Sequence, residues 1–205
     1  MGGLFRTHTV ETECREDKVK FYTGLYHALL GRGLASDVNG AYPRNDGSVG
    51  QLPMKEGTPL YNIYNTDAAW GAQWNLSQLW ILAYPEYMSE YISSHLQAYK
   101  DAGWLADGLA NNRYVSGVGT NLLSTIIASA YECGIRDFDT KIAYEACLKN
   151  ELEGKNRPFG AGKVNTTEFV KYGYVPHQDA GEGYHETFMF SASHTLEYSY
   201  SAWAV

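Results

Sequence analysis

Acidic and aromatic residues stand three positions apart at two places in the chain. Asp67 precedes Trp70, and Trp104 precedes Asp107. A carboxylate accepts hydrogen bonds from sugar hydroxyl groups, and a flat indole ring can cover the apolar face of a sugar ring. If Asp67 and Trp70 belong to one helix, their spacing puts them on the same face. We therefore expect these four residues to lie around a carbohydrate-binding subsite.

Each of these residues also has a structural interpretation. Asp67 could cap a helix that begins nearby, because an N-cap carboxylate accepts hydrogen bonds from free backbone N–H groups. Asp107 stands before Gly108, where a turn aspartate is expected more often than a sugar contact. Trp70 belongs to an apolar helical pattern that is typical of a core. Trp104 lies in a glycine-flanked loop and could face either a site rim or the interior.

The composition limits the class of protein. The chain has 205 residues, 44% hydrophobic and 19% charged, which is ordinary for one globular body with a real core. The net charge is -7 and no basic run exceeds two residues, so we expect no nucleic-acid partner. No apolar stretch is long enough for a membrane span, and residues 1–14 lack the apolar core of a signal peptide. Any export signal is therefore expected upstream.

The cysteines and histidines do not predict a metal site. Cys14, Cys133 and Cys147 lack metal-ligand or redox spacing, and the histidines lack ligand spacing. The odd number of cysteines argues against a disulfide framework, so free buried thiols are expected. A pairing of Cys133 with Cys147 across a helical hairpin is the alternative. The residues by themselves thus predict no metal ligands.

Apolar residues at spacings of three and four predict a series of helices that would position the candidate residues. The expected ranges are 16–30, 67–84, 85–100, 120–133, 139–152, 166–172 and a last helix from about 193. The second range is apolar on most sides, which predicts a helix buried on both flanks with Trp74 and Trp80 in the core. Pro85 suits the first turn of the next helix, so these two should form a tight antiparallel pair.

A long polar segment separates the first two expected helices. Residues 36–64 contain the turn signals Asn39-Gly40 and Asn45-Asp46-Gly47 together with three prolines. Loops of this length inside compact domains are often functional. We expect an ordered loop at the rim of the site. Successive helix pairs with long loops favour an all-α fold, an α/α toroid, over a repeat array, because no repeated period is visible.

Several segments form a specific set when taken in order. They read FYTGLYH at 21–27, SDVNG at 36–40 with Tyr42, GIRDFD at 134–139, AYEA at 143–146, GYVP at 173–176 and TLEY at 195–198. Together they resemble glycoside hydrolase family 92, the calcium-dependent α-mannosidases. The resemblance covers most of the chain.

The resemblance implies a large α/α barrel preceded by a β-sandwich domain, with the active site between them. On this basis, residues 1–205 are the N-terminal part of the barrel domain, truncated at both ends, and form a partial (α/α)6 toroid of antiparallel helix hairpins. The β-sandwich and the remaining barrel helices would be missing partners. The implied substrate is a mannose-containing glycan, and the implied location is periplasmic or extracellular.

The resemblance also implies an inverting mechanism assisted by bound calcium. Inverting hydrolysis needs an acid and a base roughly 6.5 to 9.5 Å apart. The family's Asn-Glu-Pro-Ser loop and its Asp-Asp run near a glycine do not occur here. We therefore expect the catalytic carboxylates and the calcium ligands downstream of Val205, and the isolated chain to be inactive.

Three positions depart from the family pattern. Its Trp-Asp-Thr is Asp67-Ala68-Ala69 here, its Gly-Asp-His is Gly119-Thr120-Asn121, and its Asp-Asp pair after TLEY is Ser201-Ala202. A rebuilt sugar subsite and a loss of activity both explain these changes. The expected substrate contacts are Asp67, Trp70, Trp104, Asp107 and Asn121. Two other functions stay open: a non-catalytic helical carbohydrate-binding scaffold, and another glycosidase built on an α/α toroid.

Overall fold

The computed structural model describes residues 8–30, 32–115, 119–177 and 190–205. Helices dominate the described part, and the strands are short. The helices are α1 (Arg15–Leu29), α2 (Ala69–Gln73), α3 (Leu76–Ala83), α4 (Pro85–Ala102), α5 (Leu123–Glu132), α6 (Thr140–Leu152), α7 (Thr166–Tyr172) and α8 (Ser191–Ala204). The strands are β1 (Ala41–Pro43), β2 (Val49–Gln51), β3 (Met54–Lys55), β4 (Thr58–Pro59), β5 (Asp67–Ala68), β6 (Gly108–Ala110) and β7 (Arg113–Tyr114).

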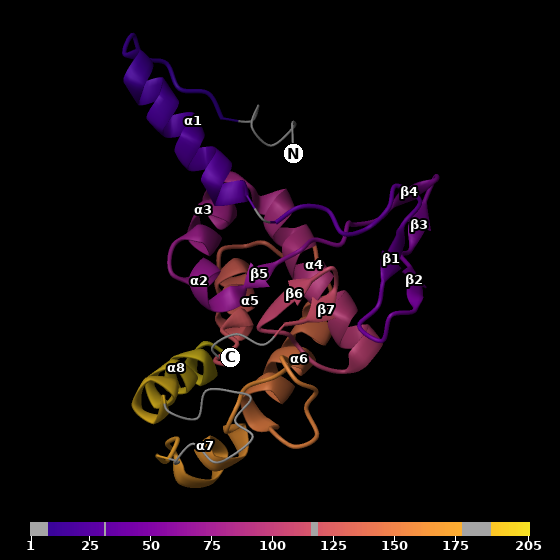
Figure 1. Cartoon of the computed structure of the whole chain (residues 1–205), viewed down its shortest axis with the longest axis vertical. Helices are drawn as coiled ribbons and strands as arrows, with labels where there is room; N and C mark the ends of the chain where they lie inside the picture. The colour runs from indigo at the N-terminus through magenta and orange to yellow at the C-terminus, as the bar shows by residue number, and fades with distance from the viewer. Residues whose placement is uncertain (1–7, 31, 116–118, 178–189) are drawn as a thin grey trace.

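The helices pair along the chain as the sequence predicts. Helix α3 packs on α4 and α5 packs on α6, while α8 packs on both α5 and α6 (Figure 1). Pro85 occupies the first turn of α4, where its missing N–H costs nothing, and Gly103 ends this helix in the left-handed conformation. At the start of α6, Asp139 accepts a hydrogen bond from the Ile142 N–H. Local signals therefore set the ends of these hairpins.

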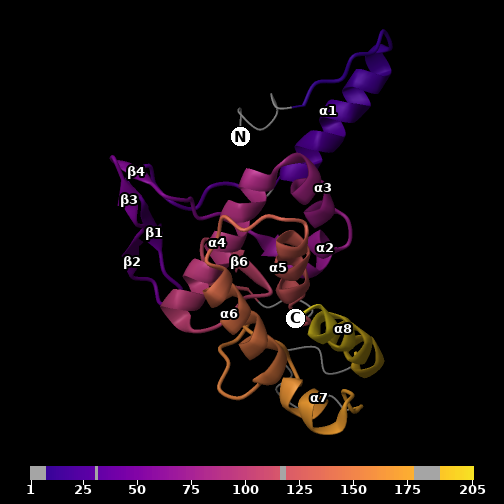
Figure 2. The same cartoon turned by 180° about the vertical axis from the view of Figure 1, so that it is seen from behind.

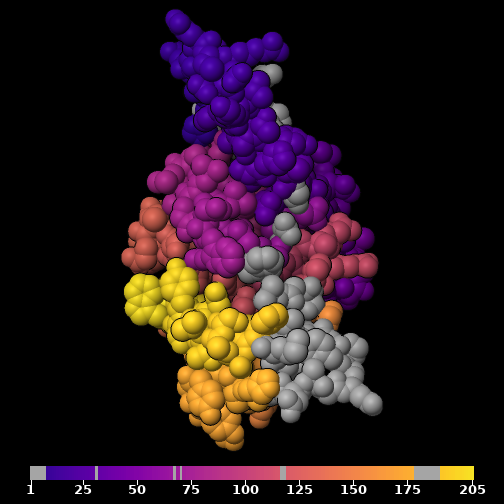
Figure 3. Space-filling view, turned by 60° about the vertical axis from the view of Figure 1, so that its left-hand side comes forward, coloured from indigo at the N-terminus to yellow at the C-terminus, as the bar shows by residue number. Residues whose placement is uncertain are grey.

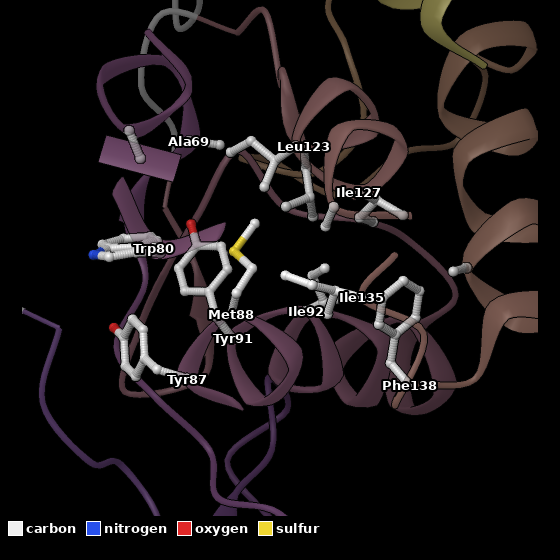
Figure 4. Close-up of a cluster of buried hydrophobic side chains, with 14 of the residues drawn as sticks. Ala69, Trp80, Tyr87, Met88, Tyr91, Ile92, Leu123, Ile127, Ile135 and Phe138 are labelled. Carbon is white, nitrogen blue, oxygen red and sulfur yellow. The ribbon is translucent and has the colours of Figure 1, made fainter. Parts of the chain in front are cut away.

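The main core lies between α3, α4, α5 and α6. Trp80 stacks at a tilt against Tyr91, with 5.1 Å between ring centroids, and makes an edge contact with Tyr87. Figure 4 shows Met88 and Ile92 of α4 pointing toward the side chains of α5. These residues are buried, and each fully buried side chain of this kind stabilises the fold by roughly 1.5 to 3 kcal/mol.

The prediction of a single helix over residues 67–84 is wrong. The helical segment is divided into α2 and α3, with Trp74 and Asn75 between them. Trp80 is fully buried as predicted, but Trp74 is 63% exposed. The apolar pattern predicts burial on both flanks, whereas Leu79 and Leu82 also face solvent among the described residues. The break turns the face of α3 away from that of α2.

The expected loop over residues 36–64 is ordered and carries two hairpins, β1 with β2 and β3 with β4. The first is tied to α4, because the Tyr42 hydroxyl donates to Asp101 Oδ2 at 2.8 Å. Tyr42 lies opposite Gly50, where a Cβ atom would approach the tyrosine ring to 2.3 Å. Only glycine fits under this ring. The hairpins stand at one edge of the molecule (Figure 1).

Helix α1 extends away from the rest of the body (Figures 1 and 2). Leu25 and Leu29 near its end are buried, but Val19, Tyr22 and Tyr26 are 56%, 37% and 47% exposed. The predicted core-facing stripe is therefore covered at one end alone within the described part of the chain. None of the described helices has both the length and the apolar character that crossing a bilayer requires.

All three cysteines are free, so the alternative pairing of Cys133 with Cys147 is wrong. The expectation of buried thiols holds for Cys147, whereas Cys14 and Cys133 are exposed. Burial raises the pKa of the Cys147 thiol to about 12. This thiol is therefore protonated and unreactive at neutral pH.

Candidate functional site

The segment formed by residues 104–110 connects the predicted site residues. On one side it pairs with β5: the Thr66 N–H donates to Leu109 O at 3.1 Å, and the Ala69 N–H donates to Asp107 O at 2.6 Å. On the other side, the Gly162 N–H donates to Leu105 O at 2.8 Å. These residues come from three distant parts of the chain. We call residues 104–110 the site strand.

Asp67 lies in β5, directly opposite Leu109 of β6. The interpretation of Asp67 as a helix N-cap is wrong, because Ala68 occupies that position and makes no side-chain cap. The argument that Asp67 and Trp70 share a helix face is wrong for the same reason, since Asp67 is in a strand and Trp70 is in α2. The backbone of Asp67 finds its partners in the site strand, which delays the start of the helix.

The side chains of Asp67 and Trp70 lie outside what the structure describes. Their backbone positions are clear, at the end of β5 and the start of α2. The contact of either side chain with a sugar stays a prediction.

Trp104 faces the interior rather than a rim. It is 7% exposed, and Lys149 Nζ of α6 lies 4.3 Å from the centroid of its ring. Its other neighbour is Gly162, where a Cβ atom would approach ring atom Cε3 to 3.0 Å. Of the two orientations open from the sequence, the structure shows the buried one. Trp104 fixes the start of the site strand against α6.

Asp107 is 1% exposed and lies in the middle of the site strand. Besides its carbonyl bond with Ala69, its N–H donates to Gly160 O at 3.4 Å. The backbone of Asp107 is thus hydrogen-bonded to Ala69, two residues after Asp67. The structure brings the two predicted carboxylate positions together, although they are 40 residues apart in sequence.

Asn121 is fully buried and supports the site strand from behind. Its Nδ2 group donates to Leu105 O at 3.1 Å, to Asn150 Oδ1 at 3.1 Å and to Gly162 O at 3.2 Å. Its φ of 44° lies in the left-handed region, which asparagine tolerates better than most residues. Direct contact of Asn121 with a sugar is not supported by this position, because its amide is used by the chain itself. The observed role is structural.

The sequence did not indicate a buried charged cluster formed by Glu151, Lys163 and Ser201. Lys163 Nζ donates to Glu151 Oε2 and to Ser201 Oγ, and Ser201 Oγ also donates to Glu151 Oε2 at 3.0 Å. Burial lowers the pKa of Lys163, and the Glu151 carboxylate opposes this change. The three residues are far apart in sequence and of types usually found at the surface. The one signal was Ser201, where the sequence departs from the pattern that the resemblance implies.

Other features lie apart from the site strand. A cavity of about 370 Å³ between α5 and α6, lined by Ile127, Tyr144 and Cys147 among others, includes none of the five predicted residues. In the described ranges, no three His, Cys, Asp or Glu side chains come together as metal ligands would. Those ranges therefore contain no acidic cluster suited to calcium, and no catalytic step here is assigned to calcium.

The chain is similar to one known protein family and to solved structures of that family. The family model of the glycosyl hydrolase family 92 catalytic domain matches residues 4–205. A family GH92 alpha-mannosidase from Bacteroides thetaiotaomicron, in complex with mannoimidazole, superposes with a TM-score of 0.77 at 21% identity over 98% of this chain. A family GH92 inverting mannosidase from Bacteroides thetaiotaomicron VPI-5482 gives 0.75 at 23% identity, again over 98% of this chain. No curated protein sequence matches the chain.

These comparisons confirm the resemblance seen in the sequence and the predicted fold. The helix hairpins form a partial helical toroid of the kind found in these structures. The chain spans 24% of the first structure's chain and 26% of the second. At this identity the structural likeness establishes the fold, while the family model establishes the ancestry.

Proposed function

Because the chain belongs to glycosyl hydrolase family 92, we propose that it is part of an α-mannosidase that acts on mannose-containing glycans. The main support is the family model, which matches nearly all of the chain. Together with the structural likeness to a mannosidase, it supports a glycoside hydrolase of the mannosidase type. The chain spans about a quarter of its structural relatives, so the activity belongs to a longer protein that contains it.

In this proposal the chain supplies part of the barrel wall and the sugar contacts. The site strand holds β5 and the start of α2 on one side, and Trp104 and Asn121 fix it from the other. Asp67 and Trp70 are the proposed sugar contacts, with Asp107 beside them. Trp104 and Asn121 act by holding the strand rather than by touching the sugar.

The proposed chemistry is inverting hydrolysis by two carboxyl groups. One protonated carboxyl donates a proton to the leaving oxygen, and one carboxylate removes a proton from a water that attacks the opposite face of the sugar. Neither role is assigned to a residue of this chain. Calcium assistance and its ligands also belong, in the proposal, to other parts of the protein.

The test is the anomeric outcome. A protein that combines residues 1–205 with the rest of a family 92 domain should release mannose from α-mannosides, and proton NMR should detect the β anomer first. Initial release of the α anomer would contradict inversion. Binding of mannosides without any release would favour the non-catalytic scaffold, which is one of the two explanations of the departure at Asp67-Ala68-Ala69.

The isolated chain should release no mannose. Calcium-dependent release that disappears in Glu197→Gln would contradict this expectation, because it would place a catalytic carboxyl on α8.

Asp67→Asn tests the proposed sugar contact. Loss of a charge-assisted hydrogen bond of about 1.5 to 3 kcal/mol should lower kcat/KM of the longer protein roughly ten- to a hundredfold. Asp17→Asn, on α1 where the side chain is 60% exposed, is the control and should change nothing. Since the N-cap role is excluded, an unchanged kcat/KM for Asp67→Asn would leave Asp67 as a strand residue without a sugar contact.

A further inference from the structure

Helix α8 buries several polar groups where it packs against the body. Its buried residues are His194, Tyr198 and Ser201, whereas Leu196 and Trp203 are 72% and 81% exposed. The main apolar cluster of the described residues contains no buried side chain from α8. Figure 3 shows α8 lying across the surface above α7. Apolar burial therefore contributes less to its docking than to the contact of α4 with α5.

The buried ammonium group of Lys163 connects α8 to α6. Lys163 donates to Ser201 of α8 and to Glu151 of α6, and its Nζ lies 5.0 Å from the centroid of the Tyr198 ring. The side chains of Lys163 and Glu151 are 1% and 5% exposed. One ammonium group thus joins two helices and the loop before α7.

Removing one charge of a buried pair leaves the other without compensation, which is far more costly than losing an exposed pair. The other groups that act on Lys163 are Cys147 of α6 and Glu197 of α8. Cys147 is protonated at neutral pH, and Glu197 is a further negative charge on α8 itself. The attraction of Lys163 to Glu151 and Glu197 therefore favours the docked position of α8, against the cost of burying the ammonium.

The docked helix also contacts the support of the site strand. The Tyr198 hydroxyl donates to Gly119 O at 3.1 Å and to Val164 O. Gly119 has a φ of 83°, and a Cβ atom there would approach Val164 to 2.9 Å, so the backbone is closely packed at this point. Two residues later, Asn121 holds Leu105 of the site strand.

We propose that the Lys163–Glu151 pair is a latch that docks α8 and, through Tyr198, sets residues 119–121 behind the site strand. This inference does not depend on the mannosidase proposal, because it concerns how parts of the fold are held together. It assigns Lys163 a positioning role.

Native-state hydrogen exchange on the unchanged chain tests the latch without any variant. Amides of α8 and of residues 119–122 should exchange together through a partial opening, at a denaturant concentration where amides of α4 are still protected. Exchange of α8 amides through global unfolding alone, with the same denaturant dependence as α4, would overturn the proposal.

Two single variants then test the charge pair. In Glu151→Gln and in Lys163→Met, α8 amides should exchange at least tenfold faster, and they should still open at a lower denaturant concentration than the α4 amides. Lys171→Met, an exposed lysine of α7, is the matched control and should leave both rates unchanged. Unchanged α8 exchange in both single variants would overturn the latch.

The double variant Glu151→Met/Lys163→Met separates charge from shape. Because an apolar pair leaves no uncompensated charge, α8 protection should recover toward that of the unchanged chain. A double variant as weakly protected as the single variants would count against the latch, since charge imbalance would then not be the cause.

Discussion

The contact of α4 with α5 and the contact of α8 with α6 are built differently. The first buries Met88, Ile92 and Ile126, with Trp80 at one end. The second buries an ammonium, a carboxylate and a hydroxyl. Apolar side chains stabilise a contact without demanding one geometry, whereas buried polar groups are costly unless every partner is in place. The fold thus uses apolar packing for stability and polar contacts to position α8.

Trp80→Ala should have the largest effect, because it removes the largest fully buried side chain of the apolar contact. We expect a loss of about 4 kcal/mol in the free energy of unfolding, from lost burial and the cavity left behind. Urea unfolding followed by circular dichroism measures it. Trp203→Ala, at an 81% exposed position, should cost less than about 0.5 kcal/mol. Equal losses would contradict the assignment of the core to α3 and α4.

His95 makes the apolar region sensitive to acid. It is fully buried against Tyr91, and among the described residues neither ring nitrogen has a hydrogen-bond partner. Burial lowers the pKa of His95 to about 3, against 6.5 in the unfolded chain. Between these values the unfolded state binds the proton and the folded state does not, so stability rises with pH across this window.

The loss attributable to His95 should reach roughly 2 kcal/mol when the pH falls from 6.5 to 5. His95→Leu should remove this part of the acid dependence, as measured by urea unfolding at several pH values. If the variant keeps the full acid dependence of the unchanged chain, the imidazole is not buried in its neutral form.

Tyr198→Phe tests the polar contact with a smaller change. It keeps the ring near Lys163 but removes the hydroxyl that bonds Gly119 O and Val164 O. Leaving these carbonyl groups without their partner should cost about 1 to 2 kcal/mol in the free energy of unfolding. Tyr144→Phe, at a 58% exposed tyrosine of α6, is the control and should be neutral. A neutral Tyr198→Phe would show that α8 does not depend on these bonds.

Asp139→Ala should have the smallest effect, because it acts at one exposed helix end, the start of α6. The Asp139 side chain accepts from the Ile142 N–H at 3.1 Å, and its loss should lower the free energy of unfolding by about 1 kcal/mol. Asp139→Asn should be close to neutral, because asparagine caps as well. Thermal melting of both variants distinguishes capping from a charge effect.

The sequence alone was sufficient wherever the deciding interactions are local. It predicted α7 at residues 166–172, the start of α4 at Pro85 and a cap of α6 at Asp137 or Asp139, of which the structure shows Asp139, because propensity, proline and N-cap bonds act within one turn. Short segments such as GYVP and TLEY also indicated the family that the family model confirms.

Tertiary structure decided the features that depend on partners distant in sequence. Asp67 is in a strand because Thr66 and Ala69 on either side of it bond to residues 107–109, and the helical pattern that begins there could not reveal a strand 40 residues away. In the same way, Lys163 is buried because Glu151 and Ser201 meet it from two different helices. A charged residue can be buried only where such partners converge, and convergence is a property of the packed chain rather than of any segment.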